Sequence, residues 1–289
     1  MKVCLKCGER FGVAGWRCPS CGFEPLTQRG RVVFAMEPAD EGEAFDPHSF
    51  EHLPAVEGRS FWFRARNELV SWALRSYFPD AGTFLEVGCG TGFVLEGLHR
   101  RFPGLRLSGG ELFAAGLDTA GERVPAATLY QLDARRIPFD AEFDVVGAFD
   151  VLEHVEDDEV ALAELARAVR PGGGVLITVP QHPRLWSDVD EFSRHRRRYR
   201  RSELRAKLER SGLDLLRLTS FVTLLLPAMA ASRLRQRKGP ETFDPLAEYG
   251  HGPLVDSTLG WAMALERRLI RLGLSLPAGG SLLAVARRP

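Results

Sequence analysis

The chain has 289 residues, 45% of them apolar and 26% charged, which is typical of a folded globular protein with one large domain or two small ones. Its 38 Lys and Arg residues are balanced by 38 Asp and Glu residues, so no net field draws it towards nucleic acid. No secretory signal opens the sequence, and the longest apolar run, residues 221–231, is too short to span a bilayer. We therefore expect a cytoplasmic protein without a transmembrane segment.

Four of the five cysteines lie near the start of the chain, as two pairs that are each followed by glycine. Two residues separate the members of a pair, so both sulfurs can face one ion. Cys4, Cys7, Cys18 and Cys21 therefore predict a structural zinc site with four thiolate ligands and no open position for catalysis. Two disulfides or a redox pair are the alternative, and the ten-residue spacer is short for a zinc ribbon. We assign residues 1–26 to a zinc-ribbon-like knuckle.

Residues 27–79 are predicted to be a linker followed by a first long helix. Before Ser60 the segment contains Pro, Gly and acidic residues without a sustained period, which indicates a connector with short elements. From Ser60 onward apolar residues recur at helical spacing, with Ser60 as an N-cap and Pro79 as the stop. This helix is expected to pack on the main sheet. Its aromatic head, with Arg64 and Arg66, either packs in the same way or lines the ligand site.

A strand-favouring run at residues 83–87 leads through three alternate glycines, Gly88, Gly90 and Gly92, into a helical pattern. Glycine permits a tight turn and lets a ligand approach backbone N–H groups, and the start of a helix favours negative charge. The turn therefore predicts a nucleotide-type ligand site.

Acidic residues follow each of the next three predicted strands. The strands and their acids are 105–110 with Glu111, 127–132 with Asp133 and 143–149 with Asp150. A helix over 156–170, a Pro-Gly-Gly-Gly turn and a fifth strand at 175–179 come next. Strands that alternate with helices predict a doubly wound, mostly parallel α/β sheet with its ligand at the carboxyl ends of the strands. An acid at the tip of the second strand, Glu111, can accept hydrogen bonds from both ribose hydroxyls.

Six arginines lie within residues 194–201, after the fifth strand and before a helix that is predicted to be capped at Ser202. They are either a solvated charge run balanced by nearby acids or a guanidinium cluster that grips a phosphate, sulfate or carboxylate group. Imidazole titrates near neutral pH, so His195 and His154 are the candidates for a general base. The alternatives are that His154 orders the loop beside the ligand and that His195 belongs to an anion site.

In their order along the chain, these motifs resemble the class I S-adenosylmethionine-dependent methyltransferases over roughly residues 60–220. The motifs are Glu86-Val-Gly-Cys-Gly-Thr-Gly92, Glu111, Leu132-Asp133-Ala134, Phe143-Asp-Val-Val146, Val151-Leu-Glu-His-Val155 and Arg170-Pro-Gly-Gly173. The rival for the glycine turn is a nicotinamide-dependent dehydrogenase, whose third glycine would fall at Phe93.

The resemblance implies a Rossmann-like fold, S-adenosylmethionine as cofactor and a set of residues that hold it. The glycine turn would cradle the methionine part, Glu111 the ribose, Asp133 with the Ala134 backbone the adenine, and Asp150 would lie near the methionine amino end. The predicted cofactor-binding residues are Glu86, Gly88, Gly90, Gly92, Glu111, Asp133, Ala134 and Asp150.

Residues 80–289 are assigned to this methyltransferase domain, with an insertion at 222–278 before the last strand. In the family that last strand, here 281–286, pairs antiparallel at the sheet edge. The insertion is predicted to contain a helix over 258–272 that ends at Gly273, and to form a lid over the substrate or an oligomer contact.

We expect an enzyme, a methyltransferase, that acts on a small-molecule or glycan-like acceptor carrying an anionic group. One alternative is an RNA base methyltransferase that binds RNA through the knuckle and the arginine loop, which would give strongly salt-dependent binding. A second alternative is a donor-binding module without catalysis, which would bind the donor and turn over no acceptor.

Overall fold

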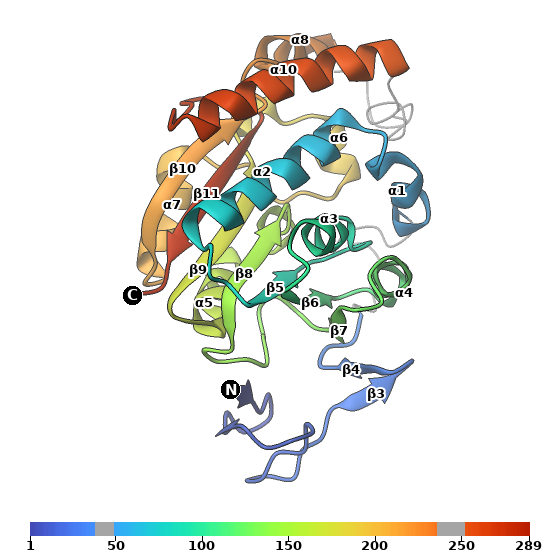
Figure 1. The fold of residues 1–289 in the computed structure, drawn as a ribbon, viewed down its shortest axis with the longest axis vertical. Helices are drawn as coiled ribbons and strands as arrows, with labels where there is room; N and C mark the ends of the chain where they lie inside the picture. Colours follow the sequence, from blue (N-terminus) through green and yellow to red (C-terminus); the bar gives the residue numbers. More distant parts are fainter. Residues whose placement is uncertain (38–48, 236–251) are drawn as a thin grey trace.

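The computed structural model describes residues 1–37, 49–235 and 252–289, and a nine-stranded sheet forms the centre of this part of the chain (Figure 1). The strand order is β10-β11-β9-β8-β5-β6-β7-β4-β3. The run from β9 to β4 is parallel, whereas β11 is antiparallel to both of its neighbours and β3 is antiparallel to β4. The predicted doubly wound, mostly parallel α/β fold is confirmed.

The strands of this sheet are β3 (Leu26–Gln28), β4 (Arg31–Val33), β5 (Thr83–Val87), β6 (Arg106–Glu111), β7 (Thr128–Gln131), β8 (Phe143–Phe149), β9 (Val169–Pro180), β10 (Asp214–Phe221) and β11 (Ser281–Arg287). The last strand was expected at the sheet edge, and this is wrong, because β10 pairs along its outer side. The Pro-Gly-Gly turn also lies inside β9. The pairing with β8 jumps from Val169 to Gly174, so the residues between them bulge out of the strand.

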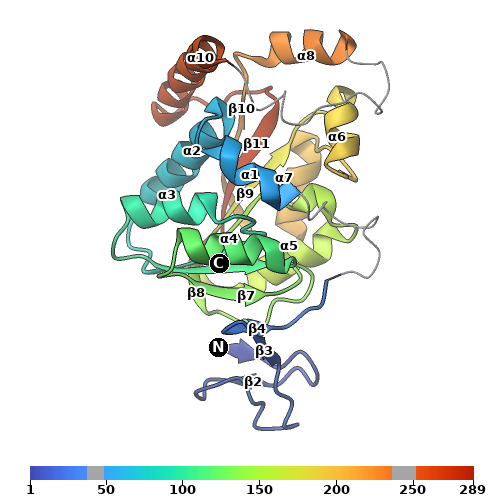
Figure 2. The same cartoon turned by 90° about the vertical axis from the view of Figure 1, so that its right-hand side faces the viewer.

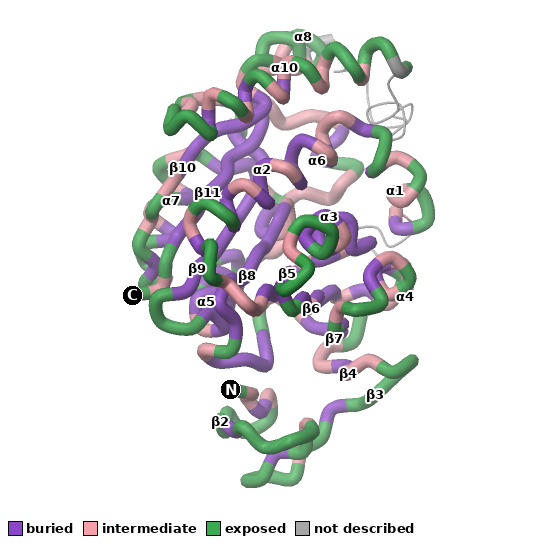
Figure 3. The backbone as a smooth tube through the Cα atoms, in the orientation of Figure 1, coloured by how far each residue is buried: buried purple, intermediate pink, exposed green. Residues whose placement is uncertain are grey.

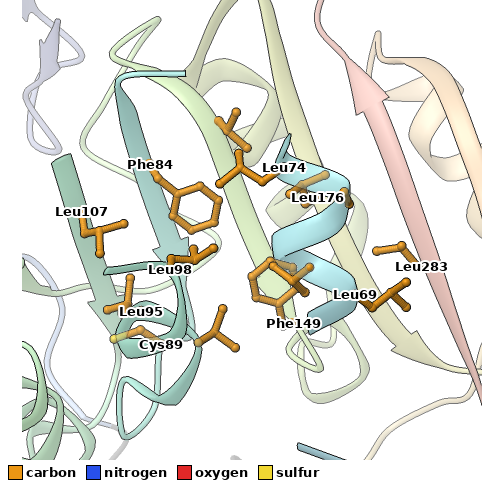
Figure 4. Close-up of a cluster of buried hydrophobic side chains, with 14 of the residues drawn as sticks. Leu69, Leu74, Phe84, Cys89, Leu95, Leu98, Leu107, Phe149, Leu176 and Leu283 are labelled. Atoms are coloured by element: carbon orange, nitrogen blue, oxygen red, sulfur yellow. The ribbon is translucent and has the colours of Figure 1, made fainter. Parts of the chain in front are cut away.

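Helices cover both faces of the sheet, as Figures 1 and 2 show. One face carries α2 (Phe61–Tyr77), α3 (Phe93–Arg101), α4 (Ala114–Arg123) and α10 (Pro253–Arg271), and the other carries α5 (Asp158–Ala168) and α7 (Arg201–Arg210). The strands β5, β8 and β11 are buried almost throughout (Figure 3), because both faces of the sheet are covered there. On the face that carries α2, side chains of this helix such as Leu69 and Leu74 pack on Phe149 and Leu176 of the sheet (Figure 4).

The insertion after β10 folds back on its own start and is fastened to β10 and to α2. Arg217 of β10 donates a hydrogen bond to the backbone carbonyl of Gly273 at 2.9 Å. It contains α8 (Leu226–Arg235) and α10, and its residues 236–251 lie outside the described part of the chain. The carboxylate of Glu266 is fully buried and accepts three backbone N–H bonds from residues 222–224 at 2.6–3.0 Å. Asp256 accepts a hydrogen bond from the backbone N–H of Phe61 at 2.6 Å. Asp256 therefore caps α2 from the insertion, whereas Ser60 stands at the N-cap position without a side-chain capping bond.

Helix boundaries differ from the predicted ones by a few residues. The insertion helix α10 begins five residues earlier than expected and ends before Gly273, whose φ of 98° stops it. The N-cap of α7 is Arg200 instead of Ser202, because the Glu203 side chain accepts a hydrogen bond from the backbone N–H of Arg200 at 3.4 Å. No described helix has both the length and the apolar character needed to cross a membrane.

The N-terminal segment lies at the end of the sheet beyond β7 (Figure 2). A two-stranded hairpin, β1 (Lys2–Val3) with β2 (Arg10–Phe11), carries the cysteines. The stretch expected to be a connector supplies β3 and β4 to the main sheet and also α1 (Ser49–Glu57). The Trp16 ring packs edge to face on Phe34, Tyr130 and Phe139 at centroid distances of 4.6–5.9 Å. This aromatic cluster holds the cysteine hairpin against the loop that follows β7.

Candidate active site

A cavity of about 1120 Å³ opens at the carboxyl ends of β5, β6, β7 and β8. Its walls come from these strand ends, from α1 and the start of α2, from the loop after β9 and from the insertion. Seven of the eight residues predicted to bind the cofactor line it: Glu86, Gly88, Gly90, Glu111, Asp133, Ala134 and Asp150. A cavity of this size can enclose a nucleotide-sized ligand together with a second small molecule.

The glycine turn between β5 and α3 requires glycine on both conformational and steric grounds. Gly88, Gly90 and Gly92 all have left-handed φ values, of 72°, 51° and 76°. A Cβ atom on Gly88 would lie 3.2 Å from Cγ1 of Val151 and closer still to Cγ2. Gly92 does not line the cavity, and a Cβ atom there would meet Ala120 at 3.0 Å. Gly92 therefore serves the packing of α3 against α4, while Gly88 and Gly90 form the cavity wall.

Glu111, at the tip of β6, ties the glycine turn to the strand that carries it. One carboxylate oxygen accepts the N–H of Gly90 at 3.0 Å, and the other accepts the N–H groups of Leu112 and Phe113 at 2.7 and 3.2 Å. Burial raises the pKa of Glu111, and these backbone hydrogen bonds oppose the rise. A carboxylate oxygen has two lone pairs, so the oxygen that faces Gly90 can accept a second hydrogen bond from a ligand hydroxyl.

Arg66 of α2 connects two of the predicted acids. Its guanidinium pairs with Asp150 at 2.5 Å and lies over the rings of Trp62 and Phe63, 4.7 and 5.4 Å from their centroids. Burial raises the pKa of Glu86 to about 8, although the charge of Arg66 acts in the opposite direction. One cation and two carboxyl groups at this point suit a ligand that carries both a carboxylate and an ammonium group.

Asp133 and Ala134 lie where the chain leaves β7. Burial raises the pKa of the Asp133 carboxyl, but hydrogen bonds from the Arg135 guanidinium and backbone N–H outweigh it, so the pKa is lowered. Both Asp133 oxygens already accept bonds from Arg135, at 2.6–3.1 Å. A ligand that uses this carboxylate therefore shares it with Arg135.

The two histidines predicted as base candidates lie together in the wall of the cavity. Their rings meet edge to face with centroids 4.8 Å apart. Burial, and then the neighbouring His195, lower the pKa of His154 to about 3, so this ring is neutral and only weakly basic. Nδ1 of His195 lies 2.9 Å from Oδ1 of Asp190, a carboxylate that is fully buried. Asp190 therefore fixes the orientation of His195 and leaves its Nε2 for other contacts.

The arginine loop is largely paired within the protein. Arg196 pairs with Glu156 at 2.5 Å, Arg197 with Asp158 at 3.4 Å and Arg198 with Asp190 at 2.7 Å. Arg201 donates to backbone carbonyls of Leu218 and Leu276. Of the six arginines, Arg196 and Arg198 line the cavity. The expected cluster of anion-gripping guanidinium groups is thus reduced to two side chains, both of which already hold a carboxylate.

Sequence reasoning missed several residues of the cavity. Phe50 and Glu57 belong to α1, in the stretch read as a connector, and Glu57 accepts hydrogen bonds from Thr91 and Arg123 at 2.6 and 2.8 Å. Met229 comes from the insertion, where periodicity alone gives no sign of a ligand. Glu153 lies in the motif Val151–Val155 without a predicted role of its own, although its position next to His154 is a usable signal.

The four predicted zinc ligands converge at the N-terminal hairpin. The sulfurs of Cys4 and Cys21 lie 3.6 Å apart and those of Cys7 and Cys18 lie 3.7 Å apart, and all four thiols are free. Four sulfurs about 2.3 Å from one ion in tetrahedral geometry would be roughly 3.8 Å apart, whereas a disulfide needs about 2.05 Å. The four thiols therefore fit a tetrahedral metal ion, and they do not fit two disulfides.

Comparisons with known proteins agree with this arrangement. Residues 85–177 match the model of the methyltransferase domain family. The chain is 32% identical to the dTDP-3-amino-3,4,6-trideoxy-alpha-D-glucopyranose N,N-dimethyltransferase of Streptomyces venezuelae, over 45% of this chain and 56% of the relative. It is also 32% identical to the trans-aconitate 2-methyltransferase of Azoarcus sp., over 41% of this chain and 46% of the relative. The chain thus spans about half the length of these curated relatives.

A solved structure shares the fold at lower sequence identity. Phosphoethanolamine N-methyltransferase 2 of Haemonchus contortus, in complex with S-adenosyl-L-methionine, superposes with a TM-score of 0.53 at 19% identity. The match covers 77% of this chain and 52% of that chain. Residues 85–177 match a methyltransferase domain, and the sheet around them has the Rossmann-like fold of the class I methyltransferases.

Proposed function

We propose that the protein is an S-adenosylmethionine-dependent methyltransferase that acts on a small-molecule or glycan-like acceptor. One observation carries the proposal: a single cavity joins the glycine turn and its acids to the two histidines. Donor and acceptor can therefore meet inside one enclosed space. The matched methyltransferase domain and the methyltransferase relatives support the same activity.

The donor occupies the end of the cavity next to β5 and β6. Its methionine carboxylate pairs with Arg66, and its ammonium group lies near Asp150 and Glu86, because these are the cation and the carboxyl groups at that point. Its ribose hydroxyls donate to the carboxylate of Glu111 at the tip of β6, which also accepts the N–H of Gly90. The adenine lies against the loop that begins at Asp133 and Ala134.

Methyl transfer needs alignment more than it needs acid or base chemistry. A lone pair of the acceptor attacks the methyl carbon while the C–S bond breaks, and its electron pair remains on sulfur in S-adenosylhomocysteine. In-line positioning in a cavity that excludes water lowers the barrier. The insertion forms part of that enclosure, since Leu225, Met229 and Leu259 line the cavity. If the acceptor must lose a proton, His154 and His195 are the side chains at its end of the cavity.

An acceptor with an anionic group remains our preferred class, with Arg196 and Arg198 facing it. Two relatives are named for an acidic metabolite and for a nucleotide sugar. We do not favour RNA as the acceptor, because the chain carries no net positive charge and only Arg196 and Arg198 of the arginine loop line the cavity.

We further propose that Cys4, Cys7, Cys18 and Cys21 hold one structural zinc ion. The sulfur spacing supports this, and so does the repeated backbone pattern of the two knuckles. In each knuckle a glycine N–H bonds the carbonyl of the first cysteine, at 2.8 Å for Gly8 and at 3.0 Å for Gly22. Free thiols in this arrangement suit a reducing compartment, so the cytoplasmic location remains our prediction.

The first test is calorimetric titration of the whole chain with S-adenosylhomocysteine and, in parallel, with NAD. We expect micromolar binding of the former and none of the latter. An acceptor screen with acidic metabolites and sugar derivatives follows, with formation of S-adenosylhomocysteine as the readout. Binding of NAD alone would overturn the assignment, and tight donor binding without turnover of any acceptor would favour a non-catalytic module.

A further inference from the structure

Three side chains in the wall of the cavity form a metal-binding type of cluster. Glu153 and His154 end the short helix η1 (Leu152–His154), and His195 comes from the loop before α7. The ligand atoms of the three residues lie within 4.8 Å of one another, and all three residues line the cavity. The fold thus brings one carboxylate and two imidazoles to one point facing the ligand space.

Glu153 is the unusual member of the cluster. Its side chain is fully buried, and within the described residues neither carboxylate oxygen has a hydrogen-bond partner. Glu266 is equally buried, but it accepts three backbone N–H bonds. The charges of Arg198 and Arg66 act on Glu153, but these two guanidinium groups hydrogen-bond to Asp190 and to Asp150 respectively. A buried carboxylate without a partner is costly, so the structure calls for a cation at this position.

His195 is oriented as metal-binding histidines usually are. Its Nδ1 lies 2.9 Å from Asp190, and Asp190 is itself held by Arg198 at 2.7 Å and by the Ser187 N–H at 2.9 Å. A carboxylate on one ring nitrogen fixes the tautomer and leaves the other nitrogen as an electron-pair donor for a metal. Backbone hydrogen bonds at Ser193 and Arg194 hold the ring of His154.

We propose that Glu153, His154 and His195 bind one divalent transition-metal ion, with Zn²⁺ as the candidate of choice. Two imidazoles and one carboxylate are a donor set of catalytic zinc sites, which keep a coordination position open. Zinc–ligand bonds of about 2.0–2.2 Å place ligand atoms roughly 3–3.5 Å apart, so the ion draws the three atoms closer than they lie now. The histidines are then ligands and not the general base.

The role of the ion rests on the proposed function, because it faces the acceptor. Its open position takes a hydroxyl oxygen of the acceptor, and the metal lowers the pKa of that hydroxyl so that the proton passes to water. The oxygen then attacks the methyl carbon of the donor, a C–O bond forms, and the C–S bond breaks with its electrons on sulfur. This specifies the acceptor class as an alcohol or phenol and the product as a methyl ether.

Zinc stoichiometry tests the proposal. The whole chain is equilibrated with Zn²⁺, freed of unbound ion by gel filtration and measured by elemental analysis. We expect about two zinc ions per chain, one at the cysteines and one at the cluster. Glu153→Gln and His195→Ala should each retain about one zinc ion, the one at the cysteines. Cys4→Ser should lose that ion and keep the one at the cluster. His99, which is exposed on α3, provides the matched control, so His99→Ala should keep about two.

A second variant tests the positioning role of Asp190. Asp190→Asn should keep both sites but weaken the cluster site by about 10–100-fold in a competition with a chelator, because the carboxylate orients His195. A merely structural role would leave this affinity unchanged. His195 is half-buried, so His195→Ala keeps the test valid if Glu153→Gln does not fold.

The outcomes separate this proposal from the proposed function. If the wild type holds about one zinc ion and Cys4→Ser holds none, the cluster does not bind zinc. The Glu153 carboxyl would then be protonated instead of bound to a cation. A second zinc that survives both Glu153→Gln and His195→Ala would overturn it as well. S-adenosylhomocysteine binding is measured in the same samples. If the wild type holds two zinc ions but does not bind S-adenosylhomocysteine, the donor site is refuted and the metal site is not. If it binds S-adenosylhomocysteine but holds only one zinc ion, the metal site is refuted and the donor site is not.

Discussion

The contact between Gly88 and Val151 gives a prediction with a calculable size. Gly88→Ala places a side chain on a residue with φ of 72°, which costs about 1–2 kcal/mol. The new Cβ lies 3.2 Å from Cγ1 of Val151 and nearer to Cγ2, whereas unstrained carbon atoms rest about 3.5–4.0 Å apart. Overpacking of this kind adds about 1–3 kcal/mol, so the free energy of unfolding should fall by about 2–5 kcal/mol.

Gly172→Ala is the matched control, because Gly172 has φ of 78° and a Cβ there meets nothing within 4 Å. It should lose only the conformational part, about 1–2 kcal/mol. Urea unfolding of both variants measures the difference. Val151→Ala and the double variant complete a cycle in which the two substitutions should couple by about 1–3 kcal/mol. Equal losses for Gly88→Ala and Gly172→Ala, or zero coupling, would refute the steric argument.

Three further predictions concern the ligands. Glu111→Gln should weaken S-adenosylhomocysteine binding in calorimetry by about ten-fold or more, because a charge-assisted hydrogen bond to the ribose is lost. Glu122→Gln, on the exposed side of α4, should leave the affinity unchanged. Equal affinities of the two variants would contradict a ribose site at Glu111. Glu86 has a pKa of about 8, so donor binding that ionises it releases a proton below that pH and strengthens as pH rises towards 8. Calorimetry in buffers of different ionisation enthalpy should show proton release on donor binding in the wild type and not in Glu86→Gln. Proton release in both proteins would contradict the assignment of the proton to Glu86. A zinc chelator should change the fluorescence of Trp16 and expose the first 26 residues to protease, because metal binding energy folds the knuckle; an unchanged digest would contradict a zinc-dependent fold.

Local pattern predicted the centre of the molecule well. Glu111 is the last residue of β6 and Asp150 directly follows β8, so each of these acids could be placed together with its strand. The partners of these acids come from far along the chain. Arg66 reaches Asp150 across 84 positions and Asp256 caps α2 across 195, and no local period encodes such pairings.

Other parts could not be predicted because their signals are too short. The strands β3 and β4 have three residues each, which is too few for an alternating pattern, and α1 contains Pro54, which argues against a helix. For the arginine loop the sequence leaves a solvated charge run and a ligand-gripping cluster open, because charge alone is visible. Its pairing with Glu156 and Asp158 depends on the way α5 meets the loop, which is a tertiary property.

Because β4 pairs with β7, the first 37 residues cover an edge of the parallel sheet. Without these residues β7 would be an edge strand with unpaired backbone N–H and C=O groups. Such an edge can pair with a strand of another molecule and lead to aggregation. The native chain ends its sheet instead on β3, a three-residue strand too short to recruit a partner. A truncation that removes β3 and β4 should therefore expose the edge of β7 and favour aggregation, whereas a truncation that keeps both strands should not.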